Sequence, residues 1–147
     1  MFYSEFKIDD TFLTAGRTVT EADIVAFAGL SGDFQSLHMD QEYAKVNAFG
    51  QRIAHGLLVL SISSGLTVQA GLTTDSVIAL YGIDKLRFLK PVFIGDTVTV
   101  KNRVIELSPK KDDKTRGVVT FETTVMKQQA EIVLIYHRLV LLRNTAQ

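Results

Sequence analysis

The sequence of 147 residues contains no cysteine, and its formal net charge at pH 7 is zero. The lack of cysteine excludes disulfides, thiolate metal sites and a cysteine nucleophile, and it fits a cytoplasmic protein. The zero net charge argues against nucleic acid as a main partner, because binding a phosphate backbone usually requires a basic face. No apolar run approaches the ~20 residues that a membrane helix needs, so we expect no membrane partner.

The sequence also shows no internal repeat and no secretory signal. The segment from Met1 to Glu5 contains no basic stretch followed by an apolar core. The hydrophobic content of 46% and the charged content of 22% are ordinary for a globular protein. A chain of this length predicts one domain, residues 1–147.

Two helices are predicted before residue 50. Thr20 is a good N-cap for the first, and we expect Gly29 to end it because glycine tolerates a left-handed backbone. Residues 30–39 are predicted to be a loop. Asp40 then caps a short helix, which we expect to turn Tyr43 and Ala44 inward.

A third and longer helix is predicted over residues 55–70. Its apolar residues lie around nearly the whole circumference, which is typical of a helix that is buried on all sides. Serine and glycine are frequent in it, and they allow other backbone to approach closely. This helix is therefore expected at the centre of the fold.

After residue 73, alternating and β-branched residues predict strands. The predicted strands are 76–80, 84–89, 97–107, 117–127 and 131–142. Short turns between long strands predict an antiparallel meander. One buried helix with such a sheet predicts an α+β fold, a curved antiparallel sheet wrapped around a long central helix.

The most informative stretch for function contains Asp33 and His38, five positions apart, next to Gly32. An Asp–His pair suits acid–base chemistry on water, since one group can hold the water while the other moves a proton. The pair by itself also fits a turn cap and a structural histidine.

The segment Phe27–His38 resembles the signature of the MaoC-like dehydratases, a family that includes the (R)-specific enoyl-CoA hydratases. Asp33, Leu37 and His38 match the usual motif, whereas Gln35 stands in place of the usual asparagine and Ser36 in place of the usual proline. The resemblance continues in Ile53-Ala54-His55-Gly56-Leu57-Leu58, in Ser64-Gly65-Leu66 and in the segment 86–96. It covers most of residues 18–105 and implies the hot dog fold, which agrees with the arrangement predicted above.

The resemblance also implies roles for individual residues. Asp33 and His38 would bind and activate the water that adds to the double bond of a trans-2-enoyl-CoA, giving an (R)-3-hydroxyacyl-CoA, or catalyse the reverse dehydration. The backbone N–H of Gly56 would polarise the thioester carbonyl, and a helix N-terminus is suited to that task. Ser64 would lie close to the catalytic pair.

Other polar residues have weaker claims. Arg87 and Lys90 could contact the phosphates of coenzyme A, although a solvated strand edge explains them equally well. His55 is expected to pack or to cap the start of the long helix. We expect no metal and no cofactor, because coenzyme A is part of the substrate.

Two alternatives to a hydratase remain open on the residues. One is a hot-dog acyl-CoA thioesterase, and the other is a non-catalytic acyl-CoA binder, which Gln35 and Ser36 keep plausible. A homodimer, or a higher homo-oligomer, is expected, because a sheet of this kind leaves open edges that need protection. The sequence does not indicate the acyl chain length.

Overall fold

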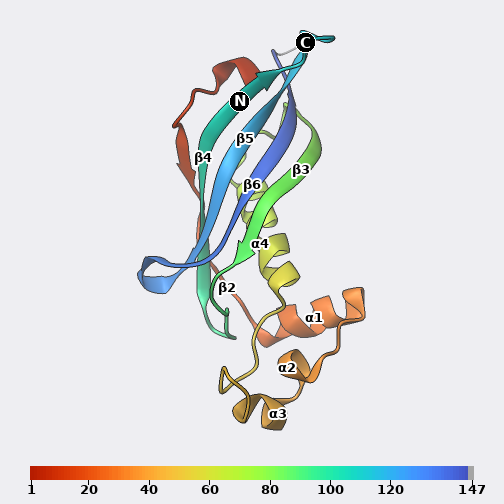
Figure 1. Cartoon of the computed structure of the whole chain (residues 1–147), viewed down its shortest axis with the longest axis vertical. Helices are drawn as coiled ribbons and strands as arrows, with labels where there is room; N and C mark the ends of the chain where they lie inside the picture. Colours follow the sequence, from red (N-terminus) through yellow and green to blue (C-terminus); the bar gives the residue numbers. More distant parts are fainter. Residues whose placement is uncertain (146–147) are drawn as a thin grey trace.

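The computed structural model describes residues 1–145, in which a curved antiparallel sheet wraps around one long helix (Figure 1). The strand order is β1-β4-β5-β6-β3, and β2 pairs with β4. The strands are β1 (Thr11–Leu13), β2 (Arg17–Thr18), β3 (Val77–Phe88), β4 (Thr97–Pro109), β5 (Arg116–Lys127) and β6 (Glu131–Arg143). The helices are α1 (Glu21–Ser31), α2 (Ser36–Met39), α3 (Gln41–Lys45) and α4 (Gly56–Gln69), with 3₁₀ turns η1 (Tyr3–Glu5) and η2 (Gln128–Ala130). The predicted α+β class is confirmed.

The sheet differs from the predicted meander at its first long strand. Hairpins join β4, β5 and β6 as expected, but β3 pairs with β6 and not with its successor β4. The two strands predicted at 76–80 and 84–89 are one strand, β3. Its register against β6 shifts between Asp84 and Arg87, and Lys85 there has a φ of 52°. Such an irregularity interrupts the alternating pattern without ending the strand.

Helix α1 begins as predicted and ends later. The Thr20 hydroxyl accepts a hydrogen bond from the N–H of Asp23, and the Asp23 carboxylate accepts one from the N–H of Thr20. The prediction that Gly29 ends this helix is wrong, because α1 continues to Ser31 and its C-cap is Gly32. Gly32 has a φ of 79°, the left-handed conformation that favours glycine.

The short helix α3 is capped by the carboxylate of Asp40, which accepts a hydrogen bond from the N–H of Tyr43. Ala44 is buried as predicted, but Tyr43 is exposed, so its predicted inward position is wrong. The predicted loop 30–39 also contains a helical turn, α2. Helices α1, α2 and α3 gather at the end of the molecule where α4 begins (Figure 1).

Helix α4 packs its buried side on the inner face of the sheet. The predicted burial on all sides is wrong, because Leu57 is 59% exposed and Val68 is 64% exposed. Within residues 1–145, no helix has the length and hydropathy that crossing a bilayer requires. The core around α4 includes Leu58, Val59, Ile62 and Leu66 from the helix and Val98, Val100, Val125, Leu134 and Tyr136 from the strands.

Candidate active site

Three titratable side chains converge where α1, α2 and α4 meet. Asp33 lies in the loop after α1, His38 lies in α2, and His55 directly precedes α4. Each offers one carboxylate or imidazole atom that lies within 4.8 Å of the corresponding atoms of the other two. The structure therefore brings together the predicted pair Asp33 and His38 and adds His55 to it.

Local hydrogen bonds hold the backbone around Asp33. The Ser31 hydroxyl donates to the carbonyl of Phe27 (2.7 Å) and accepts from the N–H of Asp33 (3.2 Å). The Asp33 carboxylate accepts a hydrogen bond from the N–H of Gln35 (3.3 Å). Such a bond to the backbone two residues later is the usual way in which aspartate stabilises a turn. The carboxylate is half-buried and so remains partly open to solvent.

His38 is 7% exposed, and one of its ring nitrogens has a defined partner. Its Nδ1 lies 2.7 Å from the carbonyl oxygen of Ile53. A carbonyl oxygen only accepts hydrogen bonds, so Nδ1 carries the proton, and Nε2 of the neutral ring is left with a free lone pair. His38 is thus oriented with a basic nitrogen away from the backbone.

Arg52 connects α2, which contains His38, to the start of α1. This buried side chain donates from Nε to the carbonyl oxygen of His38 (2.6 Å) and from Nη1 to the carboxylate of Glu21 (2.5 Å). The end of α2 is therefore bonded to the start of α1 through one guanidinium, whose planar fork suits two simultaneous contacts.

His55 is buried and packs between two rings. Its ring stacks on that of His38, with centroids 3.8 Å apart and planes 28° apart, and its other neighbour is Phe27 at 4.9 Å. Its Nε2 lies 2.9 Å from the carbonyl oxygen of Asp33, and its Nδ1 has no hydrogen-bond partner in the described part of the chain. His55 occupies the N-cap position of α4 without a side-chain capping bond, and its burial between the rings of Phe27 and His38 confirms the predicted packing.

Asp33, His38 and His55 are also the residues that could hold a metal ion. Ligands of one ion must direct their lone pairs to a common point. The planes of the stacked rings are only 28° apart with centroids at 3.8 Å, so the lone pairs of the two rings lie in separate, nearly parallel planes that do not meet close to both nitrogens. This arrangement suits an ordered water beside the Asp–His pair better than an ion bound by both histidines.

Gly56 follows His55 and is the first residue of α4. The first N–H groups of a helix have no acceptor within it and carry the positive end of the helix dipole. A Cβ added at Gly56 would lie 2.8 Å from Cε1 of the Phe88 ring, so a side chain there would displace that ring. Glycine thus allows the Phe88 ring to pack directly against the start of α4.

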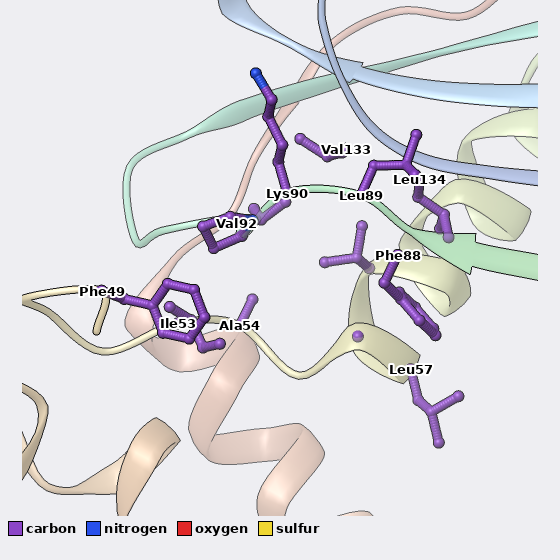
Figure 2. A pocket seen from close by; sticks show the side chains of 13 residues that line it. Phe49, Ile53, Ala54, Leu57, Phe88, Leu89, Lys90, Val92, Val133 and Leu134 are labelled. Atoms are coloured by element: carbon purple, nitrogen blue, oxygen red, sulfur yellow. The ribbon is translucent and has the colours of Figure 1, made fainter. Parts of the chain in front are cut away.

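An apolar pocket of about 460 Å³ adjoins the start of α4 (Figure 2). Its walls come from the loop before α4, the first turns of α4, the end of β3 and the start of β6. The lining residues include Ile53, Gly56, Leu57, Val59, Phe88 and Leu134. A pocket with apolar walls and a free helix N-terminus can hold an acyl group with its carbonyl at the helix.

The other predicted site residues lie on α4, on β3 and in the segment after β3. Ser64 is half-buried, two turns after Gly56, whereas its neighbour Ser63 is buried and bonded to the hydroxyl of Tyr136 (2.9 Å). Lys90 lines the pocket and pairs with Glu131 (2.8 Å). Arg87 is exposed and donates to the carbonyl of Leu86 (2.7 Å).

The sequence did not predict that His55 bonds to Asp33 and stacks on His38. It also did not predict that Arg52 bonds to His38 and Glu21. A histidine directly before the glycine of a predicted helix start was the available signal for His55. For Arg52 we find no such signal, because its partners Glu21 and His38 are distant in sequence and are joined only by the fold.

A comparison with protein families matches residues 5–128 to the MaoC-like domain. The protein MaoC of Klebsiella aerogenes is 43% identical over 117 residues, which are 77% of this chain and 34% of that protein. This chain thus spans about a third of its length. An (R)-specific enoyl-CoA hydratase of Rhodospirillum rubrum is 40% identical over 108 residues, which are 74% of this chain and 69% of that protein.

Solved structures agree with these relatives. A monoamine oxidase regulatory protein from Archaeoglobus fulgius has a TM-score of 0.92 and 42% identity, with coverage of 99% of this chain and 96% of that one. A Mycobacterium tuberculosis protein described as a double hot dog fold has a TM-score of 0.86 at 22% identity, with coverage of 100% of this chain and 45% of that one. The predicted hot dog fold is confirmed.

Proposed function

This chain belongs to the MaoC-like dehydratase family, and on that premise we propose that it hydrates a trans-2-enoyl-CoA reversibly to an (R)-3-hydroxyacyl-CoA. Hydratase and dehydratase activity in the family is supported by relatives named (R)-specific enoyl-CoA hydratase and 3-hydroxybutyryl-CoA dehydratase. The observation that carries the proposal is the convergence of Asp33 and His38 with His55 at the start of α4, where the next residue, Gly56, lines the apolar pocket.

In the proposed reaction, Asp33 and His38 bind one water molecule between them. One group holds the water while the other takes its proton, and the resulting hydroxide forms a bond to C3 of the enoyl chain. The electrons of the C2–C3 double bond move toward the thioester oxygen, and the proton is returned to C2. The His38 Nε2 lone pair, left free by the bond from Nδ1 to Ile53, suits the proton-accepting role.

The N–H of Gly56 would stabilise the negative charge that develops on the thioester oxygen. One donor in such a position is typically worth about 3–4 kcal/mol of barrier in other enzymes. The acyl chain would lie in the apolar pocket, whose wall contains Gly56 and Leu57. Ser64 is proposed to contact the substrate further along α4.

Incubation with crotonyl-CoA tests this proposal. Loss of enoyl absorbance without release of free thiol indicates hydration. Thiol release would indicate a thioesterase, and no reaction with any short or medium enoyl-CoA, despite binding, would indicate an acyl-CoA binder. Either of the last two results would refute the hydratase.

Site variants make the test specific. Asp33→Asn and His38→Ala should each lower turnover by at least about a hundredfold, because acid–base groups usually contribute at least that much. Asp112→Asn and His137→Ala are matched controls, since Asp112 lies in the β4–β5 hairpin tip and His137 in β6, paired with Glu122 of β5. Near-normal turnover by a well-folded Asp33 or His38 variant would contradict the assignment.

The remaining parts of the proposal concern partners. We propose that the chain forms a homodimer, because β3 is an edge strand that exposes apolar side chains along its length. We also propose that Arg87, near the end of β3, and Lys90, just after it, contact coenzyme A phosphates. The protein is proposed to work in the cytoplasm.

A further inference from the structure

We propose that His55 is a positioning residue that holds the Asp33–His38 pair in place relative to the N-terminus of α4. The inference rests on the proposed function, because the pair is taken as the acid–base centre. His55 contacts both residues of the pair, although it lies 22 positions after Asp33 in the sequence.

The first contact fixes the backbone of Asp33. His55 Nε2 lies 2.9 Å from the Asp33 carbonyl oxygen, and because a carbonyl only accepts, Nε2 donates the proton. The two residues are 22 positions apart, so this bond joins the loop after α1 to the start of α4. This bond is partly buried, and a hydrogen bond shielded from water restricts a loop more than an exposed one, since water competes for it less.

The second contact fixes the ring of His38. The His55 ring lies against it at 3.8 Å and is itself supported by Phe27 at 4.9 Å. His38 is thus restrained on one face by His55 and at Nδ1 by the carbonyl of Ile53. With both restraints in place, the Nε2 lone pair of His38 keeps one direction.

The third link is covalent, since His55 directly precedes Gly56. A displacement of His55 would therefore move the proposed oxyanion donor, Asp33 and His38 relative to one another. A restraint from outside the segment 33–38 compensates for Ser36, which stands where the family motif usually has a proline that would limit the backbone. A misplacement of about 1 Å between catalytic groups can cost on the order of a hundredfold in rate.

Three variants separate the hydrogen bond from the packing. In His55→Gln, the side-chain amide nitrogen can reach the position of Nε2 and donate to Asp33. His55→Asn is the matched control, because its amide is one methylene shorter and reaches only the position of Nδ1. His55→Phe keeps an aromatic ring for stacking and has no donor.

The assays are steady-state hydration of crotonyl-CoA, thermal unfolding, and amide hydrogen exchange of residues 31–38. We expect His55→Gln to retain kcat within about tenfold, with wild-type exchange rates. His55→Asn and His55→Phe should lower kcat about a hundredfold with KM within about threefold, and they should accelerate exchange in the loop. A residue that only fills space would not produce this rescue by the longer amide.

Two results would overturn the proposal. One is wild-type kcat and exchange in the Asn and Phe variants. The other is an equal loss of activity and melting temperature in all three, which would reduce His55 to a packing residue. If the wild type hydrates no enoyl thioester, the proposed function fails separately, and the exchange comparison still decides whether His55 positions the loop.

Discussion

Replacing Ser36 by proline should stabilise the protein, because the chain already has the backbone conformation that proline requires. Gln35 has φ −56° and ψ 139°, which is the extended geometry favoured by a residue before proline. Ser36 is the first residue of α2, where proline is favoured and where the N–H has no acceptor within the helix. The substitution therefore costs no intrahelical hydrogen bond.

The expected gain follows from the lower entropy of the unfolded chain. A proline at a compatible position usually stabilises by about 0.4–1 kcal/mol. For a domain of about this size, 1 kcal/mol corresponds to a shift of about 2–4 °C in Tm, so Tm should rise by about 1–4 °C. Calorimetry measures this shift, and Ser36→Ala is the control that removes the hydroxyl without restricting φ.

Adding Gln35→Asn to Ser36→Pro restores the usual family motif and tests the site at the same time. The double variant should keep or raise the rate of crotonyl-CoA hydration, because Asp33 and His38 would retain their positions. A large loss of both stability and activity would show that the loop follows a different backbone path. The family roles of Asp33 and His38 would then no longer be supported, and a binder would be favoured.

Three further predictions concern stability and assembly. Arg138 is buried, and its Nε has no hydrogen-bond partner in residues 1–145. No carboxylate of these residues forms a salt bridge with it. Burial lowers the pKa of the Arg138 guanidinium. Arg138→Met should therefore leave the free energy of unfolding unchanged or raise it by about 1–4 kcal/mol in denaturant titrations, and a marked loss would contradict this. Burial alone would raise the pKa of Asp96, but hydrogen bonds from a backbone N–H, an amide and the Lys127 ammonium outweigh it and hold that pKa below its usual value. This contribution to stability is present above the ordinary aspartate pKa of about 4 and is lost as pH falls further, so Asp96→Asn should flatten the acid side of a stability–pH curve; an unchanged slope would refute it. Light scattering at micromolar concentration should show a dimer that Leu80→Lys, on the exposed edge strand β3, weakens; a fully active wild-type monomer would contradict this.

The sequence alone determined the features that depend on near neighbours. The caps of α1 and α3 involve Thr20 with Asp23 and Asp40 with Tyr43, each pair three residues apart. The extent of α4 and the long strands β4, β5 and β6 follow from periodic patterns within each segment. Asp33 and His38 could be paired from sequence because they lie five positions apart in one segment that resembles the MaoC-like signature.

Only the tertiary structure decided which segments meet. Strand β3 pairs with β6 and not with β4, the next strand in sequence, because β4 already pairs with β5 on one side and with β1 and β2 on the other. The sequence could not show that one side of α4 is exposed, because apolar residues occur on both the exposed and the buried side of this helix. His55 reaches Asp33 across 22 residues and Arg52 reaches Glu21 across 31, and no local pattern encodes contacts over such separations. Chain folding alone brought His55, at the start of the central helix, to Asp33 and His38.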